Sequence, residues 1–121
     1  GTLFALTEES SASDAFKQAC TQLEEGDTML CLKKLAPSRL VKNGLYNRIA
    51  EAEAKGAEVS ELLEILGEKA TRRGIFDGDT ENGEMEIGQI ASAIKQVEPV
   101  SVVMQRLVKE YDDALKGIMQ K

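Results

Sequence analysis

A helical pattern first appears after a polar cluster rich in helix-capping residues, Thr7 to Asp14. Beyond this cluster, apolar side chains recur at the spacing of one helix face: Phe16, Ala19, Cys20 and Leu23. The pattern predicts an amphipathic helix over about residues 14–25, which ends at Gly26.

Similar stripes predict four more helices. They cover residues 37–55, loosened at Gly44; residues 60–73, between Ser60 and Gly74; residues 84–96; and residues 99–120, where Pro99 suits the first turn. In the third of these segments the inward positions would be Ile87, Ile90, Ala91 and Ile94.

Short apolar runs at two places lack this periodicity. Residues 1–6 indicate the end of a buried strand or an extended entry, and residues 27–32 indicate a strand or an extended connector. Residues 75–83 are dense in Gly, Asp and Asn, which is typical of a loop. The predicted fold class is therefore mainly α, about five helices with one or two short strands.

The composition allows one modest core. The chain has 121 residues and is 42% hydrophobic, but it has only three Phe, two Tyr and no Trp to supply large buried areas. A core this lean indicates that some apolar surface is covered by something outside the chain.

The charge balance of the chain disfavours two classes of partner. With 21 acidic and 15 basic residues, the net charge is −6, which repels phosphate backbones and anionic membrane surfaces. No signal peptide and no apolar run of spanning length is visible. We therefore expect no nucleic-acid partner, no membrane partner and a cytoplasmic location.

The sequence contains few groups that catalyse reactions by themselves. It has no histidine, which excludes the usual Ser–His–Asp and Cys–His arrangements. Cys20 and Cys31 match no zinc or redox spacing, so we interpret them as two reduced core thiols. We expect no metal site and no catalytic residue in this chain.

A calcium loop is suggested by the alternating acids Asp77, Asp79 and Glu81, but the required positions do not fit. If Asp77 is position 1 of the loop, position 6 requires a glycine but is occupied by Asn82. Position 12 requires a bidentate glutamate but is occupied by Gly88. The pattern therefore disfavours calcium.

Glycines mark two further candidate sites. Gly1 and Thr2 offer backbone amides and a hydroxyl of the kind that bind phosphate, although a Gly-Thr pair alone is a weak signal. Small residues at 88–93 predict close packing against another helix, and the alternative is a binding role for the Gln89 amide.

Several short motifs occur together in a recognisable order: Gly1-Thr2-Leu3-Phe4, Thr7-Glu8-Glu9-Ser10, Arg39-Leu40-Val41-Lys42-Asn43-Gly44-Leu45, Gly78-Asp79 with Gly83, and Gly88-Gln89-Ile90-Ala91. In this order the chain resembles the C-terminal part of the flavin-dependent nitronate monooxygenase family, formerly called 2-nitropropane dioxygenase. That family includes the flavin-type enoyl-acyl-carrier-protein reductases. The resemblance extends from Gly1 to the last predicted helix.

The resemblance implies a (β/α)₈ TIM barrel that holds FMN. Residues 1–26 would form the end of the last barrel strand and the following helix, and residues 27–121 a C-terminal helical subdomain over the active-site side. The matching family backbone contacts the FMN phosphate, so Gly1 and Thr2 are the implied cofactor-binding residues. No role is implied for Arg39, Asn43 or Gln89.

A barrel of this kind needs about 250 residues, so most of it would precede Gly1, together with the family's catalytic histidine. We therefore expect the chain to be inactive alone, to bind the N-terminal barrel portion of the same protein, and to self-associate when isolated. The alternative is a free-standing helical protein-interaction module without enzymatic activity.

Overall fold

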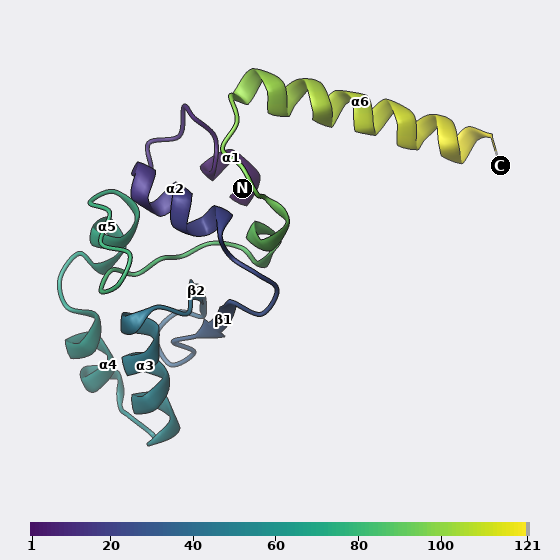
Figure 1. Cartoon of the computed structure of the whole chain (residues 1–121). Helices are drawn as coiled ribbons and strands as arrows, with labels where there is room; N and C mark the ends of the chain where they lie inside the picture. Colours follow the sequence, from purple (N-terminus) through teal and green to yellow (C-terminus); the bar gives the residue numbers. More distant parts are fainter. Residues whose placement is uncertain (121) are drawn as a thin grey trace.

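Helices and one small sheet make up the structure, a computed structural model that describes residues 1–120 (Figure 1). In chain order the elements are α1 (Thr2–Ala5), α2 (Asp14–Thr21), β1 (Thr28–Cys31), β2 (Ser38–Val41), α3 (Gly44–Ala54), α4 (Val59–Leu66), α5 (Ala70–Ile75), the 3-10 helix η1 (Gln89–Ala93) and α6 (Val100–Met119). The mainly α fold class is confirmed.

The hairpin of β1 and β2 lies between two hydrophobic clusters. The strands are antiparallel, with Thr28 opposite Val41 and Cys31 opposite Ser38. Because successive side chains of a strand point to opposite faces, Val41 joins one cluster and Leu40 the other. The first cluster contains Leu6, Phe16, Cys20, Leu23, Val41, Met85, Ile87 and Ala91. The second contains Cys31, Leu32, Leu40, Leu45, Ile49, Ala57 and Leu62.

Helix α2 begins where the polar cluster predicts, with Ser13 as its N-cap. The Ser13 hydroxyl accepts a hydrogen bond from the amide of Phe16 at 3.2 Å. The buried ammonium group of Lys17 donates to the carbonyls of Glu8 and Ser10, at 3.2 and 2.8 Å, and so ties the preceding loop to the helix. The helix ends at Thr21, short of the predicted end near Gly26.

The expected extended segment at residues 1–6 is wrong, because Thr2–Ala5 form the helical turn α1. The amide of Ala5 donates to the carbonyl of Gly1 at 3.0 Å, as in a helix. The turn buries Leu6 in the first cluster. The predicted boundary between residues 1–26 and 27–121 stays a prediction.

The expected helix over residues 37–55 is correct only in its second part. Residues Ser38–Val41 form β2, and α3 begins at Gly44. The Asn43 side chain caps α3, accepting the amide of Tyr46 at 3.0 Å. The local pattern missed the strand because its pairing partners lie elsewhere in the chain.

A single helix over residues 60–73 is also wrong, since the chain breaks into α4 and α5. Gly67 and Lys69 both have positive φ, 69° and 55°, which no α-helix can contain. Gly74, predicted as the helix end, lies inside α5.

The expected α-helix at residues 84–96 is replaced by an extended segment followed by η1. The segment hydrogen-bonds with β2: the amide of Val41 donates to the carbonyl of Met85 at 2.9 Å, and the amide of Ile87 donates to that of Arg39 at 3.3 Å. Met85 and Ile87 are buried, whereas Ile90, expected inward, is 58% exposed. Backbone pairing therefore overrides the helical period.

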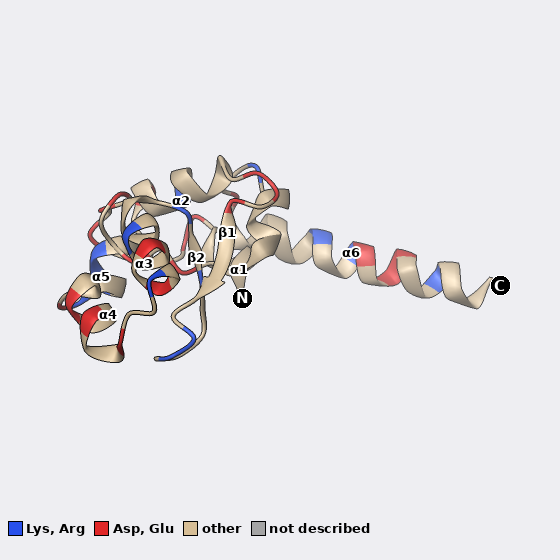
Figure 2. Ribbon diagram, turned by 90° about the horizontal axis from the view of Figure 1, so that it is seen from below, with Lys and Arg blue, Asp and Glu red and all other residues tan. Residues whose placement is uncertain are grey.

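The predicted C-terminal helix is confirmed as α6, which extends away from the rest of the chain (Figure 1). Only Val103 of this helix is buried. Charged residues of both signs lie along its middle (Figure 2). Neither α6 nor any other helix within residues 1–120 combines the length and apolar character needed to cross a membrane.

Candidate functional site

Thr2 and Gly88 meet at the centre of the candidate site. The amide of Gly88, just before η1, donates a hydrogen bond to Thr2 Oγ1 at 3.0 Å. A Cβ atom at Gly88 would collide with the same hydroxyl oxygen, so this approach requires glycine. Because Oγ1 acts as acceptor here, the hydroxyl hydrogen of Thr2 is left to donate to a ligand.

Gly1 lies beside this contact and is exposed. A side chain at Gly1 would meet no atom within 4 Å, so its backbone is open to solvent. An open cavity of about 380 Å³ covers this region. Its lining consists of Gly1, Thr2, Ala5, Arg39, Glu86, Ile87 and Gly88. The structure thus places both predicted cofactor-binding residues on one cavity.

Arg39 of β2 reaches the same cavity, although the family resemblance implies no role for it. Its side chain is half-buried, and Nη1 donates to the carbonyl and the hydroxyl of Thr28 at 3.3 and 3.2 Å. Arg39 also lines a second cavity of about 310 Å³. The other residues of that lining are Glu25, Gly26, Thr28, Gln89, Ile90 and Ser92.

Gln89 and Asn43, which also belong to the family motifs, lie in different surroundings. Gln89 is exposed on the second cavity, and within residues 1–120 its side chain has no hydrogen-bond partner. The Asn43 amide donates to the carbonyls of Thr80 and Gly83, both at 2.9 Å. Asn43 therefore joins α3 to a distant loop and is structural.

The acidic loop at residues 77–83 uses its carboxylates for local contacts. Asp77 pairs with Arg72 at 3.7 Å, and the Asp79 carboxylate accepts the amide of Asn82 at 2.9 Å. In the described part of the chain, no three potential metal-ligating side chains gather into a site. Gly83 at the end of this loop packs directly on the backbone of Gly74.

Both cysteines are free and buried, in different clusters. Burial raises the pKa of the Cys20 thiol to about 12. Burial, with smaller effects of Glu53 and Glu84, raises the pKa of the Cys31 thiol to about 11. Both thiols are therefore protonated and unreactive at neutral pH, as expected for core residues.

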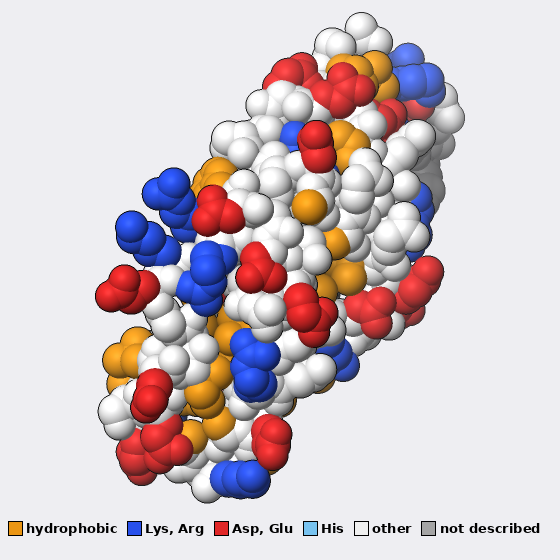
Figure 3. Space-filling view, turned by 60° about the vertical axis from the view of Figure 1, so that its left-hand side comes forward, with side chains coloured by type: hydrophobic (Ala, Val, Ile, Leu, Met, Phe, Trp, Pro, Cys, Tyr) orange, Lys and Arg blue, Asp and Glu red, His pale blue; other side chains and the backbone are white. Residues whose placement is uncertain are grey.

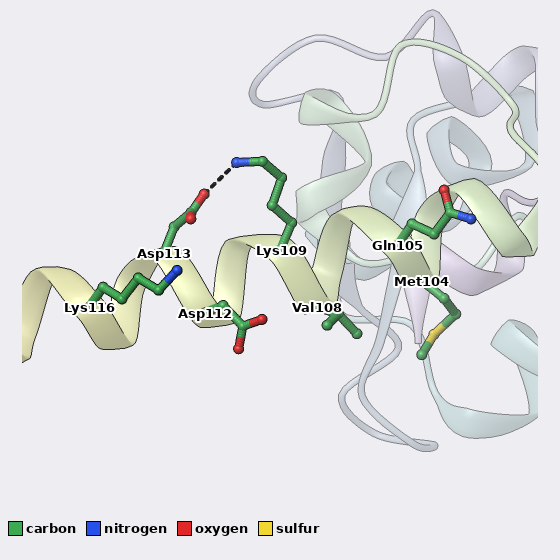
Figure 4. A pocket seen from close by; sticks show the side chains of 7 residues that line it. All are labelled: Met104, Gln105, Val108, Lys109, Asp112, Asp113 and Lys116. Atoms are coloured by element: carbon green, nitrogen blue, oxygen red, sulfur yellow. Dashed lines mark hydrogen bonds and ion pairs between the residues drawn. The ribbon is translucent and has the colours of Figure 1, made fainter.

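A hollow of about 530 Å³ runs along α6, but all of its lining residues belong to that one helix (Figure 4). Met104 and Val108 point to one side of the helix, while Lys109 and Asp113 form an ion pair at 2.6 Å on the other (Figure 4). A single helix cannot enclose a small molecule, so this is an exposed helix face and no ligand cavity.

The model of the nitronate monooxygenase family matches residues 1–110. Among solved structures, FabK from Thermotoga maritima is 26% identical to this chain with a TM-score of 0.85, and the match covers 98% of this chain and 37% of that chain. Its M276A mutant matches at 23% identity and a TM-score of 0.76, covering 98% and 35%. The chain thus spans little more than a third of the length of these neighbours. No significant match occurs among curated proteins.

Proposed function

This chain belongs to the nitronate monooxygenase family, and on that premise we infer that it forms the C-terminal part of an FMN-dependent oxidoreductase. FMN would supply the electron transfer, either in oxidising a nitronate or in reducing an enoyl thioester. The residues of this chain would bind part of the cofactor and cover the active site. The single observation that carries the proposal is the family match over residues 1–110. The position of Gly1 and Thr2 on one cavity supports it.

The residues present fit the phosphate end of FMN. The Thr2 hydroxyl keeps a hydrogen to donate, and the open backbone at Gly1 allows an oxygen atom to approach closely. Thr2 is held in place by Gly88, so its hydroxyl is oriented before a ligand binds. The part of the cofactor beyond the phosphate would contact residues outside this chain.

The share of FabK that the chain covers supports a longer protein. The matched part is 37% of the FabK chain, while a (β/α)₈ barrel by itself needs about 250 residues. A barrel preceding residue 1 would account for both the missing length and the missing histidine.

The exposed face of α6 supports the same proposal. Its apolar side chains follow a spacing of four and three residues: Met104, Val108, Tyr111, Leu115 and Ile118, which are 43–71% exposed. The face seen in Figure 3 is mixed, with hydrophobic areas separated by charged side chains. The N-terminal barrel portion of the same protein is the proposed partner of α6.

The test uses the protein encoded by the complete reading frame, purified and assayed for bound FMN. We expect Thr2→Val to weaken FMN binding about tenfold by removing a hydrogen bond to a charged group, and to leave riboflavin binding unchanged. Thr71→Val, which removes an exposed hydroxyl bonded to Glu84, is the matched control. A reading frame without an upstream glycine-rich, histidine-containing α/β region overturns the proposal, as does unchanged FMN affinity in Thr2→Val.

The exposed stripe of α6 equally favours one alternative, a helical protein-interaction module. An initiator Met directly before Gly1, together with a monodisperse chain that unfolds cooperatively, would favour this alternative. FMN released from the purified longer protein would exclude it.

A further inference from the structure

Arg39 stands between the two cavities that flank Gly88 and Gln89. Arg39 lines the cavity of Gly1 and Thr2 and also the cavity of Thr28 and Gln89. No role follows for it from the family resemblance, and it lies outside the hydrophobic clusters.

The main chain holds Arg39 and Thr2 in fixed positions relative to each other. The carbonyl of Arg39 accepts the amide of Ile87 at 3.3 Å, and the next amide, that of Gly88, donates to Thr2 Oγ1 at 3.0 Å. Two consecutive hydrogen bonds therefore connect the strand that carries Arg39 to the residue predicted to bind phosphate.

The Arg39 guanidinium has donors left for a ligand. Nη1 is engaged with Thr28, whereas Nη2 and Nε have no partner among residues 1–120, and no carboxylate oxygen of these residues lies within 4.0 Å of the guanidinium. Because no buried side-chain nitrogen lacks a partner in the described residues, these free donors are open to solvent. A guanidinium anchored on one side and free on the other is suited to two parallel hydrogen bonds with an oxyanion.

We propose that Arg39 binds a phosphate oxyanion of a ligand that lies along the groove from Thr2 past Gly88 to Gln89. The Thr2 hydroxyl and the Gln89 amide are the neutral donors of this groove. Glu86 and Glu25 also line it and oppose anions, which restricts the oxyanion to the neighbourhood of Arg39. The attribution of the phosphate to FMN rests on the proposed function, but the binding of an oxyanion by Arg39 does not.

The test is a titration of the 121-residue chain with sodium phosphate. Sodium chloride keeps the ionic strength constant throughout the titration. The NMR signals of Arg39 Nε–H and of the Gly88 amide report the binding. We expect saturable shifts in the millimolar range. Arg39→Gln should weaken binding about tenfold, since it removes charge-assisted hydrogen bonds, and Glu86→Gln should tighten it. Arg48→Gln is the control, because Arg48 also bonds to a neutral group, the side chain of Asn82, at 3.2 Å.

Equal phosphate binding in Arg39→Gln and the native chain, or equal losses in Arg39→Gln and Arg48→Gln, overturns the proposal. Should Arg39→Gln unfold, Arg39→Lys keeps the charge without the paired donors and is expected to bind phosphate more weakly than the native chain. Unchanged affinity in both Arg39→Lys and Glu86→Gln would also overturn it.

A second arm identifies the source of the phosphate in the longer protein. If Arg39 binds the flavin phosphate, Arg39→Gln weakens FMN and leaves riboflavin unchanged. If it binds a second phosphate-bearing ligand, FMN affinity is unchanged while inorganic phosphate still saturates Arg39 in the chain. Either result supports the Arg39 site, and the Thr2→Val experiment separately decides the proposed function.

Discussion

The amide of Gly88 donates a hydrogen bond to the hydroxyl of Thr2 at 3.0 Å, across a sequence separation of 86 residues. This bond connects the segment before η1 to the start of α1, and both residues line the cavity of the candidate site. Its loss therefore affects the stability and the geometry of the same region.

Thr2→Val keeps the shape of the side chain but removes the acceptor for Gly88. We expect the free energy of unfolding to fall by about 1–2 kcal/mol, because a half-buried amide is left without its partner. Urea unfolding measures this change, and Thr2→Ser, which keeps the hydroxyl, should lose much less. Equal losses in Thr2→Val and Thr2→Ser would show that the methyl group and not the hydrogen bond matters.

Gly83→Ala tests the close packing of two backbone segments. A Cβ atom at Gly83 would collide with the backbone of Gly74 and with the carbonyl of Asp79, which cannot move as a flexible side chain can. We expect a loss of about 3 kcal/mol in denaturant unfolding. Gly117→Ala is the control, since nothing lies within 4 Å of its Cβ position in α6, and it should raise helicity and cost no stability. A folded Gly83→Ala protein of native stability would contradict the packing.

Self-association of the isolated chain should depend on the apolar stripe of α6. Val108 is 55% exposed in the middle of this stripe, and covering it with a second helix removes apolar area from water. In sedimentation experiments we expect the native chain to associate with rising concentration and Val108→Glu to remain monomeric. Gln105→Glu adds the same charge off the stripe and should associate like the native chain. A monomeric native chain at all concentrations contradicts this prediction.

Stability should decrease at alkaline pH because of Cys20. Its pKa is raised from 9.0 to about 12 in the folded chain, so the folded state holds its proton after the unfolded thiol has lost it. The stabilisation is complete below pH 9 and is lost as the pH rises from there toward the folded pKa.

Cys20→Ala isolates this effect from that of other groups. The variant should be less stable than the native chain at about pH 8 because it leaves a small cavity, and the difference in unfolding free energy should shrink toward about pH 11. Denaturant unfolding at a series of pH values provides the measurement. A difference that stays constant over this range would mean that the Cys20 thiol titrates alike in both states.

Local signals in the sequence located the elements whose causes lie within a few residues. Ser13 caps α2 through the amide of Phe16, three residues later, and α6 follows a stripe that its own side chains define. The absence of histidine and the ordered glycine-containing motifs are likewise visible in the sequence alone. The family match confirms the resemblance that these motifs indicate.

Only the tertiary structure decided where distant backbone segments pair. Residues 38–41 carry helical spacing, yet they are extended because they pair with β1. Residues 84–88 carry the same spacing and are extended because the carbonyl of Met85 accepts the amide of Val41 and the amide of Ile87 donates to the carbonyl of Arg39. The hydrogen bond between Val41 and Met85 satisfies buried backbone groups as well as a helical hydrogen bond does. Its two residues are more than forty positions apart, so this pairing produces no periodic pattern in the local sequence.

The sequence by itself determined the family, the helical character, and Gly1 and Thr2 as candidate residues. The fold decided that Thr2 is held by Gly88, that Asn43 is structural, and that Arg39 reaches the same cavity. The physical reason is that capping and amphipathicity act within one or two helical turns, whereas a binding site is formed by segments that meet only when the chain folds.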